Sequence, residues 1–322
     1  MSLSLLHRFL AGLLAALLPL VAAHGADASV ACPPASAPLT AESLNAGIRT
    51  AKDHGFLWRV TKDGRSSYLY GTIHAARTDW MFPGPVTLDA LRQSDTLALE
   101  LDVLDPDVQR RLAASISGQR REPLPPALTR RIERRLKAEC ADAETFAKFA
   151  PEFQIASLSV MAARRDGLDP ANAIDLVLAV LARELGKPVA SLETPEVQMQ
   201  ALQMPSQAET IDFVSSGLDD LESGRTRPML NRMAKVWTEG NYDELARFES
   251  WCSCVDTATE RAAMKRMLDD RNPQLAAAID NLHGSGTRVF AAVGSLHMIG
   301  PKGLPNLLRQ RGYKVEQGDF AR

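Results

Sequence analysis

Apolar runs near the start of the chain have the lengths and spacing of β-strands. Residues 57–60 and 67–70 are two such runs, and the polar residues 62–65 between them include the dipeptide Asp-Gly. Asp-Gly between two apolar runs is typical of a β-hairpin turn. Residues 96–101 are a third strand candidate, so we expect β-structure directly after a short helix predicted near residues 42–53.

The middle of the chain has a helical pattern. Residues 106–281 are rich in Ala, Leu and Arg and are punctuated by Pro and Gly. Within this region residues 174–185 are apolar almost all round, which predicts a buried helix. Residues 187–193 have the pattern of a short strand or an extended passage.

The end of the chain returns to strands. Residues 288–293 and 313–316 are strand candidates, and residues 304–311 between them are predicted to form a helix. Strands at both ends with helices between them predict an α/β (α+β) fold. We expect a central mixed sheet formed by both ends of the chain, with a large helical insertion.

The N-terminus has the parts of a secretory signal. A single positive charge at Arg8 precedes the uncharged apolar residues 9–23, and small residues allow cleavage after Ala23 or Ala28. A retained membrane anchor is the alternative, but the run is short for a span. We expect an exported protein, periplasmic or secreted, with no stable membrane anchor after cleavage. The chain then divides into a signal peptide (1–28), an N-terminal linker and helix (29–55) and one domain (56–322).

Cysteine usage agrees with export. The four cysteines are Cys32, Cys140, Cys252 and Cys254, and an even number in an exported chain favours disulfide bonds. A bridge between Cys252 and Cys254 would close a very small ring. We therefore expect each of these two to pair with one of the two distant cysteines, in an order that the sequence leaves open.

Composition and charge exclude several classes of protein. The chain has 322 residues, a formal net charge of -2 and 6% aromatic residues. Without a basic field or many aromatic residues, nucleic acid is not an expected partner. A nucleophile elbow, a phosphate-binding loop, a dinucleotide fingerprint and a His-Glu-x-x-His helix do not occur in the sequence.

Two segments near the chain ends resemble each other. Each has a strand, a Gly-x-x-His corner, a helix and a returning strand, which predicts a duplicated unit. The corners are Gly71 to His74 and Gly294 to His297, and the returning strands end at Glu100 and Glu316. A glycine lets the chain turn sharply after a strand. We expect Glu316 to be a relic of the duplication or a structural residue.

The corners carry the candidate chemistry. Each histidine should project beyond the carboxyl end of its strand, where ligands bind in open α/β sheets. Two imidazoles from neighbouring strands and the Glu100 carboxylate form a set of metal ligands that leaves coordination positions open, which suits Zn, Mn, Fe or Co. Such a metal promotes hydrolysis by activating water. Glu100 is either a ligand or the general base; alternatively His74 and His297 are ordinary loop residues.

These motifs resemble the TraB/GumN family, which includes bacterial GumN-like and pheromone-shutdown proteins and animal Tiki proteins. The resemblance spans residues 56 to 317 and is carried by residues 69–74, 97–101, 174–176, 187–194, 271–272 and 292–297. It implies an α/β fold with a central sheet and a helical insertion, and divalent-metal-dependent proteolysis. It also implies that His74, His297 and Glu100 bind metal and catalyse, supported by residues in the matching motifs: Asp175, Glu193, Arg271, Asn272, Gly71 and Gly294.

The supporting residues also have individual interpretations. Arg271 is an electrostatic clamp for a substrate carboxylate or oxyanion, or a surface charge at a helix end. Glu193 fixes a histidine or caps the helix before Pro195. Asp175, in an otherwise apolar helix, favours a buried salt bridge to a partner such as Arg271. Ala173 departs from the family, in which Gly often precedes the Ile-Asp pair.

The sequence therefore predicts a metal-dependent hydrolase, a peptidase, that uses His74, His297, Glu100 and Arg271. The expected cofactor is a divalent ion such as Zn, Mn or Co, and the expected partner is a peptide or small-molecule substrate. Two alternatives use the same residues. One is a non-catalytic binding protein for a peptide, haem or metal, and the other is a metal-independent His/Glu hydrolase that resembles an esterase.

Overall fold

The computed structural model describes residues 32–318 apart from 35, 119–121 and 253. This part of the chain forms one six-stranded sheet in the order β4-β3-β5-β2-β1-β6. Neighbours among β4, β3, β5 and β2 are parallel, whereas β1 is antiparallel to β2 and to β6. The prediction of a mixed sheet built by both chain ends is confirmed. The strands are β1 (Phe56–Lys62), β2 (Arg65–Thr72), β3 (Thr96–Leu99), β4 (Val189–Ser191), β5 (Val289–Gly294) and β6 (Lys314–Gln317).

The predicted hairpin joins β1 to β2. Lys62 pairs with Arg65 across the turn, and both turn residues, Asp63 and Gly64, have positive φ angles of 52° and 70°. A two-residue turn of this kind matches the twist of the strands that it joins. At the centre of the sheet, every residue of β5 is buried, as expected for a parallel strand covered on both faces.

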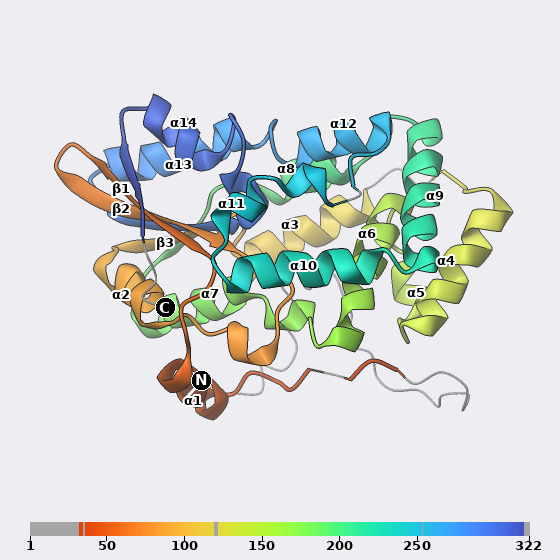
Figure 1. The fold of residues 1–322 in the computed structure, drawn as a ribbon, viewed down its shortest axis with the longest axis horizontal. Helices are drawn as coiled ribbons and strands as arrows, with labels where there is room; N and C mark the ends of the chain where they lie inside the picture. Colours follow the sequence, from red (N-terminus) through yellow and green to blue (C-terminus); the bar gives the residue numbers. More distant parts are fainter. Residues whose placement is uncertain (1–31, 35, 119–121, 253, 319–322) are drawn as a thin grey trace.

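Helices cover both faces of the sheet (Figure 1). The connection from β2 to β3 contains α2 (Pro85–Gln93), and the connection from β5 to β6 contains α14 (Leu304–Gln310). The first connection starts from β2 and runs toward the β4 edge of the sheet, whereas the second starts from the adjacent strand β5 and runs toward the β6 edge. Because crossovers between parallel strands are right-handed, α2 and α14 lie on opposite faces. The point between β5 and β2 is therefore where an open sheet binds ligands.

Two further helices complete these layers. The predicted buried helix is α7 (Ile174–Glu184), which lies with α2 on one face, and α13 (Asn272–Gly284) lies with α14 on the other (Figure 1). Seven of the eleven residues of α7 are buried. Asp175 lies in its first turn, which brings a carboxylate to the sheet edge where the parallel strands end.

The helical insertion extends away from the sheet (Figure 1). It has a hydrophobic core of its own, in which α6 packs against α9 through Phe153, Leu158, Val214 and Leu218. Among the described residues, no helix combines the length and apolarity needed to cross a membrane. The remaining helices are α1 (Ala41–Thr50), α3 (Pro106–Ser117), α4 (Pro126–Ala138), α5 (Ala143–Phe146), α6 (Pro151–Ala162), α8 (Pro195–Leu202), α9 (Gln207–Ser223), α10 (Thr226–Thr238), α11 (Tyr242–Leu245) and α12 (Ala258–Met267).

The disulfide bonds differ from the prediction. Cys32 pairs with Cys140, and Cys252 pairs with Cys254. The small ring closes because the two Cα atoms lie 5.1 Å apart, within disulfide range. The expected distant pairing of Cys252 and Cys254 is therefore wrong. The predicted signal peptide, residues 1–28, lies outside the described residues.

Candidate active site

The carboxyl ends of four adjacent parallel strands carry the site. Glu193 follows β4, Glu100 follows β3, His297 follows β5 and His74 follows β2. Parallel strands end at the same edge of a sheet, so residues that are distant in sequence meet there. We call these four residues together with Arg271 the edge cluster.

Glycines allow the close approach of the two corners. A Cβ atom added to Gly294 would lie 3.0 Å from His74 Nε2 and 3.2 Å from Glu100 Oε1, tighter than ordinary contacts between such atoms. The backbone N–H of Gly294 instead donates to Glu100 Oε1 at 2.8 Å. Ser295 Oγ donates to the carbonyl oxygen of Thr72 at 2.7 Å and so ties the two corners together.

Asp175 orients His74. Its Oδ2 lies 3.1 Å from His74 Nδ1, and its Oδ1 accepts from Thr72 Oγ1 at 2.8 Å. A carboxylate can only accept, so Nδ1 carries the proton and Nε2 of the neutral ring holds a lone pair. The expected salt bridge of Asp175 is thus made with His74, and not with Arg271 as suggested from sequence.

Asn272 orients His297 in the same way. Its Oδ1 lies 2.5 Å from His297 Nδ1, while its Nδ2 donates to the carbonyl oxygen of Lys302 at 2.9 Å. The amide orientation is therefore fixed, so that Nδ1 of His297 donates and Nε2 holds the lone pair. Orienting partners of this kind are typical of histidines that bind metals.

Arg271 is the hub of the edge cluster. Its Nη2 donates to Glu100 Oε2 at 2.6 Å and to Glu193 Oε1, and its Nε donates to Glu193 Oε2 at 3.1 Å. Its Nη1 contacts the carbonyl oxygen of Met267 at 2.9 Å and His297 Nε2 at 3.4 Å. All five N–H groups of the guanidinium therefore have protein partners. This geometry favours a positioning role for Arg271 over direct contact with substrate.

Glu193 is neither a helix cap nor the partner of a histidine. The cap of α8 is Thr194, whose side chain accepts from the backbone N–H of Val197. Glu193 pairs with Arg271, and the amide of Gln198 donates to it at 2.5 Å and to Glu100 at 3.3 Å. Both sequence interpretations of Glu193 are therefore wrong.

Two polar neighbours of the site residues were missed from sequence, Gln198 and Thr72. An amide one helical turn after Glu193 is only a weak local signal for the first, and nothing marks the threonine that follows Gly71. Glu316, the counterpart of Glu100, lies on β6 and pairs with Lys314 and Arg59. Its exposed ion pairs agree with a structural residue.

The protonation of the edge cluster follows from burial and from its single permanent cation. Burial of Glu100 would raise its pKa, but Arg271 and the histidines hold the pKa of this carboxyl well below its usual range. Burial raises the pKa of Glu193, with Arg271 opposing. Burial would lower the pKa of His74, but the nearby carboxylates raise it to about 9. Burial lowers the pKa of His297 to about 4.

Two imidazoles and a carboxylate are donors of the type that divalent metals bind. His74 Nε2 lies 3.8 Å from Glu100 Oε1, and His297 Nε2 lies 4.0 Å from Glu100 Oε2. Tetrahedral ligands about 2.1 Å from a metal lie about 3.4 Å apart, so the side chains would have to close by a few tenths of an ångström to hold one. Within the described ranges, however, no three or more His, Cys, Asp or Glu side chains form a preassembled metal group.

Comparison with known proteins identifies one family. The model of the TraB/PrgY/gumN family matches residues 56–317, which is nearly the whole chain and includes every residue of the edge cluster. Neither the curated proteins nor the solved structures contain a match to this chain.

Proposed function

This chain belongs to the TraB/PrgY/gumN family, and we propose that it is a divalent-metal-dependent hydrolase that cleaves peptides outside the cytoplasm. In this proposal His74, His297 and Glu100 hold the metal. One observation carries it: both histidines contact a fixed acceptor through Nδ1, which leaves the two Nε2 atoms 3.8 and 4.0 Å from oxygens of the same carboxylate. Once His74 has lost its second proton, these nitrogen and oxygen atoms form a set of donors for a divalent cation.

The roles of the protein groups follow from exposure and hydrogen bonding. Glu100 accepts from Gly294, Arg271 and Gln198, and a carboxylate stabilised by three donors suits a ligand better than a general base. The side chain of His74 is 34% exposed, whereas that of His297 is 5% exposed. Substrate therefore approaches from the side of His74. A bound divalent ion would supply the polarisation of the scissile carbonyl and the acidity of an attacking water.

Location outside the cytoplasm has separate support. The two disulfide bonds are of a kind that persists in oxidising compartments. The apolar N-terminal run with its small residues has the form of a cleavable export signal. Both features favour the periplasm or the cell exterior as the place of action.

A second candidate is hydrolysis without metal. It is favoured by Arg271, whose guanidinium already faces His297 Nε2 at 3.4 Å and Glu100 at 2.6 Å. In that case His74, partly exposed and paired with Asp175, is the acid–base group, and Arg271 and Glu100 fix the geometry. The two candidates share residues but differ in their response to a chelator.

The deciding experiment measures metal and turnover on the same mature protein. Purified chain is loaded separately with Zn, Mn and Co, its metal content is determined by mass spectrometry, and cleavage of a fluorogenic peptide library is followed with and without EDTA. The variants are H74A and H297A, and H54A is the matched control because His54 lies outside the edge cluster and contacts the carbonyl oxygen of Thr238.

The outcomes separate the candidates. Near-stoichiometric metal that only H74A and H297A lose, with turnover abolished by EDTA and restored by one ion, supports the metallohydrolase. Turnover that resists EDTA but requires His74 supports the metal-free hydrolase. Folded wild-type protein with neither metal nor turnover contradicts both and favours a binding protein.

A further inference from the structure

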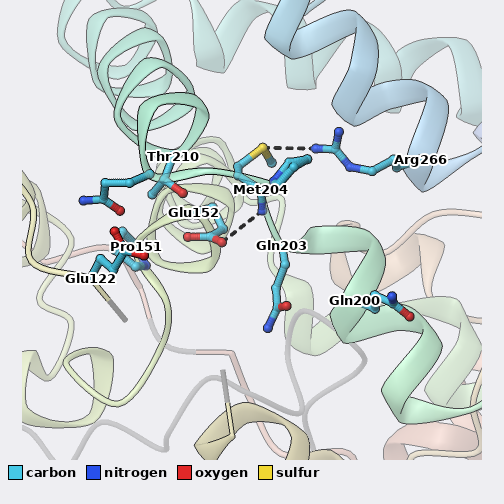
Figure 2. Close-up of a pocket in the computed structure, with 10 residues that line it drawn as sticks. Glu122, Pro151, Glu152, Gln200, Gln203, Met204, Thr210 and Arg266 are labelled. Carbon is cyan, nitrogen blue, oxygen red and sulfur yellow. Dashed lines mark hydrogen bonds between the residues drawn. The ribbon is translucent and has the colours of Figure 1, made fainter. Parts of the chain in front are cut away.

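A polar cavity lies in the helical insertion, and none of its lining residues belongs to the edge cluster. Its volume is about 460 Å³, and it opens among α6, α8, α9 and α12 (Figure 2). This volume is within the range of about 300–1,000 Å³ that is typical of ligand pockets. The lining side chains that matter to the argument are Glu152, Gln200, Gln203, Met204, Gln207 and Arg266.

Arg266 is the unusual residue of this cavity. Its buried Nε has no hydrogen-bond partner in the described part of the chain, and its Nη2 contacts only a thioether, Met204 Sδ, at 3.1 Å. Sulfur is a weak acceptor, and a buried N–H group such as Nε is normally paired. A buried polar group without a protein partner needs a water, an ion or a ligand to satisfy it.

The unpaired Nε and the weakly paired Nη2 of Arg266 lie on one edge of the guanidinium. Nε and Nη2 together are the pair of donors that holds a carboxylate with two parallel hydrogen bonds. Arg111 binds Glu196 through this same edge elsewhere in the chain, at 3.0 and 2.6 Å. At Arg266 the edge faces Met204 (Figure 2), whose flexible side chain can move aside for a ligand.

The rest of the lining suits a peptide. Glu152 is 5% exposed and accepts from the backbone N–H of Met204 at 3.2 Å, on the other side of Met204 from Arg266 (Figure 2). The carboxamides of Gln200 and Gln203 also line the cavity, and carboxamides both donate and accept. A segment of polypeptide offers the matching N–H and C=O groups.

Two helices that line the cavity, α8 and α12, also contact the edge cluster. On α8, Gln198 contacts Glu100 and Gln200 lines the cavity. At the end of α12, Arg266 lines the cavity, while the carbonyl oxygen of the next residue, Met267, holds Arg271. A ligand in the cavity is therefore connected to the edge cluster by short, packed elements.

We propose that this cavity is a substrate subsite, in which Arg266 binds a carboxylate group of a peptide through its Nε–Nη2 edge. The inference rests on the proposed peptidase function for the identity of the ligand as substrate, but the binding itself does not depend on catalysis. The carboxylate comes from a free C-terminus or from an acidic side chain.

The test measures retention of peptides by the full mature chain. Three pentapeptide libraries are used: free C-termini without Asp or Glu, amidated C-termini with Asp and Glu, and amidated C-termini without either. Retained peptide, intact or cleaved, is separated by size exclusion and quantified by mass spectrometry. The variants are R266Q and R266K, and K265Q is the matched control because Lys265 is exposed one residue away on α12.

We expect retention of one or both carboxylate-bearing libraries to exceed that of the third library at least tenfold, and which of the two is retained identifies the source. R266Q should abolish the difference, R266K should retain only part of it because lysine lacks the fork, and K265Q should leave it unchanged. Equal retention of all three libraries by wild-type protein would overturn the inference even if no variant folds.

The same experiment keeps this inference separate from the proposed function. H74A should lose cleavage but keep the retention of carboxylate-bearing peptides. Cleavage by wild-type protein without selective retention would contradict the subsite and leave the hydrolase standing. Selective retention without cleavage would support the cavity as a peptide-binding site and contradict its role as a substrate subsite.

Discussion

Replacement of Arg271 by methionine tests the charge arrangement of the edge cluster. The guanidinium is the partner of both Glu100 and Glu193, whose side chains are 10% and 3% exposed. Removing one partner of a buried ion pair costs about 3–5 kcal/mol of unfolding free energy because the remaining charge stays buried. At about 2–4 °C per kcal/mol, R271M should lower Tm by roughly 6–20 °C.

Neutralising one carboxylate of the edge cluster should reduce the free energy of unfolding much less than removing Arg271. One guanidinium serves two carboxylates, and burial already raises the pKa of Glu193. E193Q alone should therefore cost about 1 kcal/mol or less. In the R271M background, E193Q should recover part of the lost stability, because one of the two uncompensated charges is removed. The sign of this coupling distinguishes buried electrostatics from simple loss of packing.

The assay is urea unfolding of the mature chain at pH 7 in EDTA, followed by tryptophan fluorescence. R288M is the matched control, because Arg288 makes a similar fork with Asp95 but the two side chains are 51% and 42% exposed. Such an exposed pair contributes about 1 kcal/mol or less. If R271M is no less stable than R288M, or if E193Q recovers nothing in the R271M background, the reasoning is wrong.

Three other predictions concern the corners and the disulfide bonds. In chelator-treated protein, D175N should lower the pKa of His74 from about 9 toward its ordinary value, measured by NMR titration. Because a raised histidine pKa stabilises the fold below pH 6.5 and this contribution is lost as pH rises through 9, the urea midpoint should fall over that interval in wild type and fall less in D175N. Gly294→Ala places a Cβ 3.0 Å from His74 Nε2, so metal retention should fall about tenfold or more. The free energy of unfolding should fall less than in R271M. Unchanged metal content would contradict the close approach of the two corners. Cys140→Ser opens a loop of 108 residues, and Cys254→Ser opens one of two residues. Chain entropy therefore predicts a loss of about 4–5 kcal/mol of unfolding free energy for the first variant and about 1–2 kcal/mol for the second. The reverse order would contradict this account.

The sequence predicted the elements that local patterns determine. Asp63-Gly64 between two apolar runs is sufficient for the hairpin, because few residues tolerate two consecutive positive φ angles. The position of the histidines was also predictable, since each Gly-x-x-His corner comes directly after a strand and parallel strands end at one edge. That reasoning brings His74 and His297 together without knowledge of any distance.

Long-range partners were not predictable in the same way. The sequence suggested Asp175 as the partner of Arg271, whereas in the structure Arg271 forms ion pairs with Glu193 and Glu100. The difference depends on β4 lying beside β3 at one end of the sheet, an order that no local pattern encodes. The role of Asn272 was equally hidden, because a side chain that caps no helix is recognised only from what it contacts.

The charges at the sheet edge connect the two candidate mechanisms. Glu100, Glu193 and Asp175 place three carboxylates around one permanent cation, Arg271, so that the site with neutral histidines carries excess negative charge. This excess can be balanced by a proton on His74, which the raised pKa of that group reflects, or by a divalent ion. The proton and the ion are then competing occupants of one electrostatic position. Metal affinity should consequently rise with pH up to about 9, and metal binding at neutral pH should release a proton from His74.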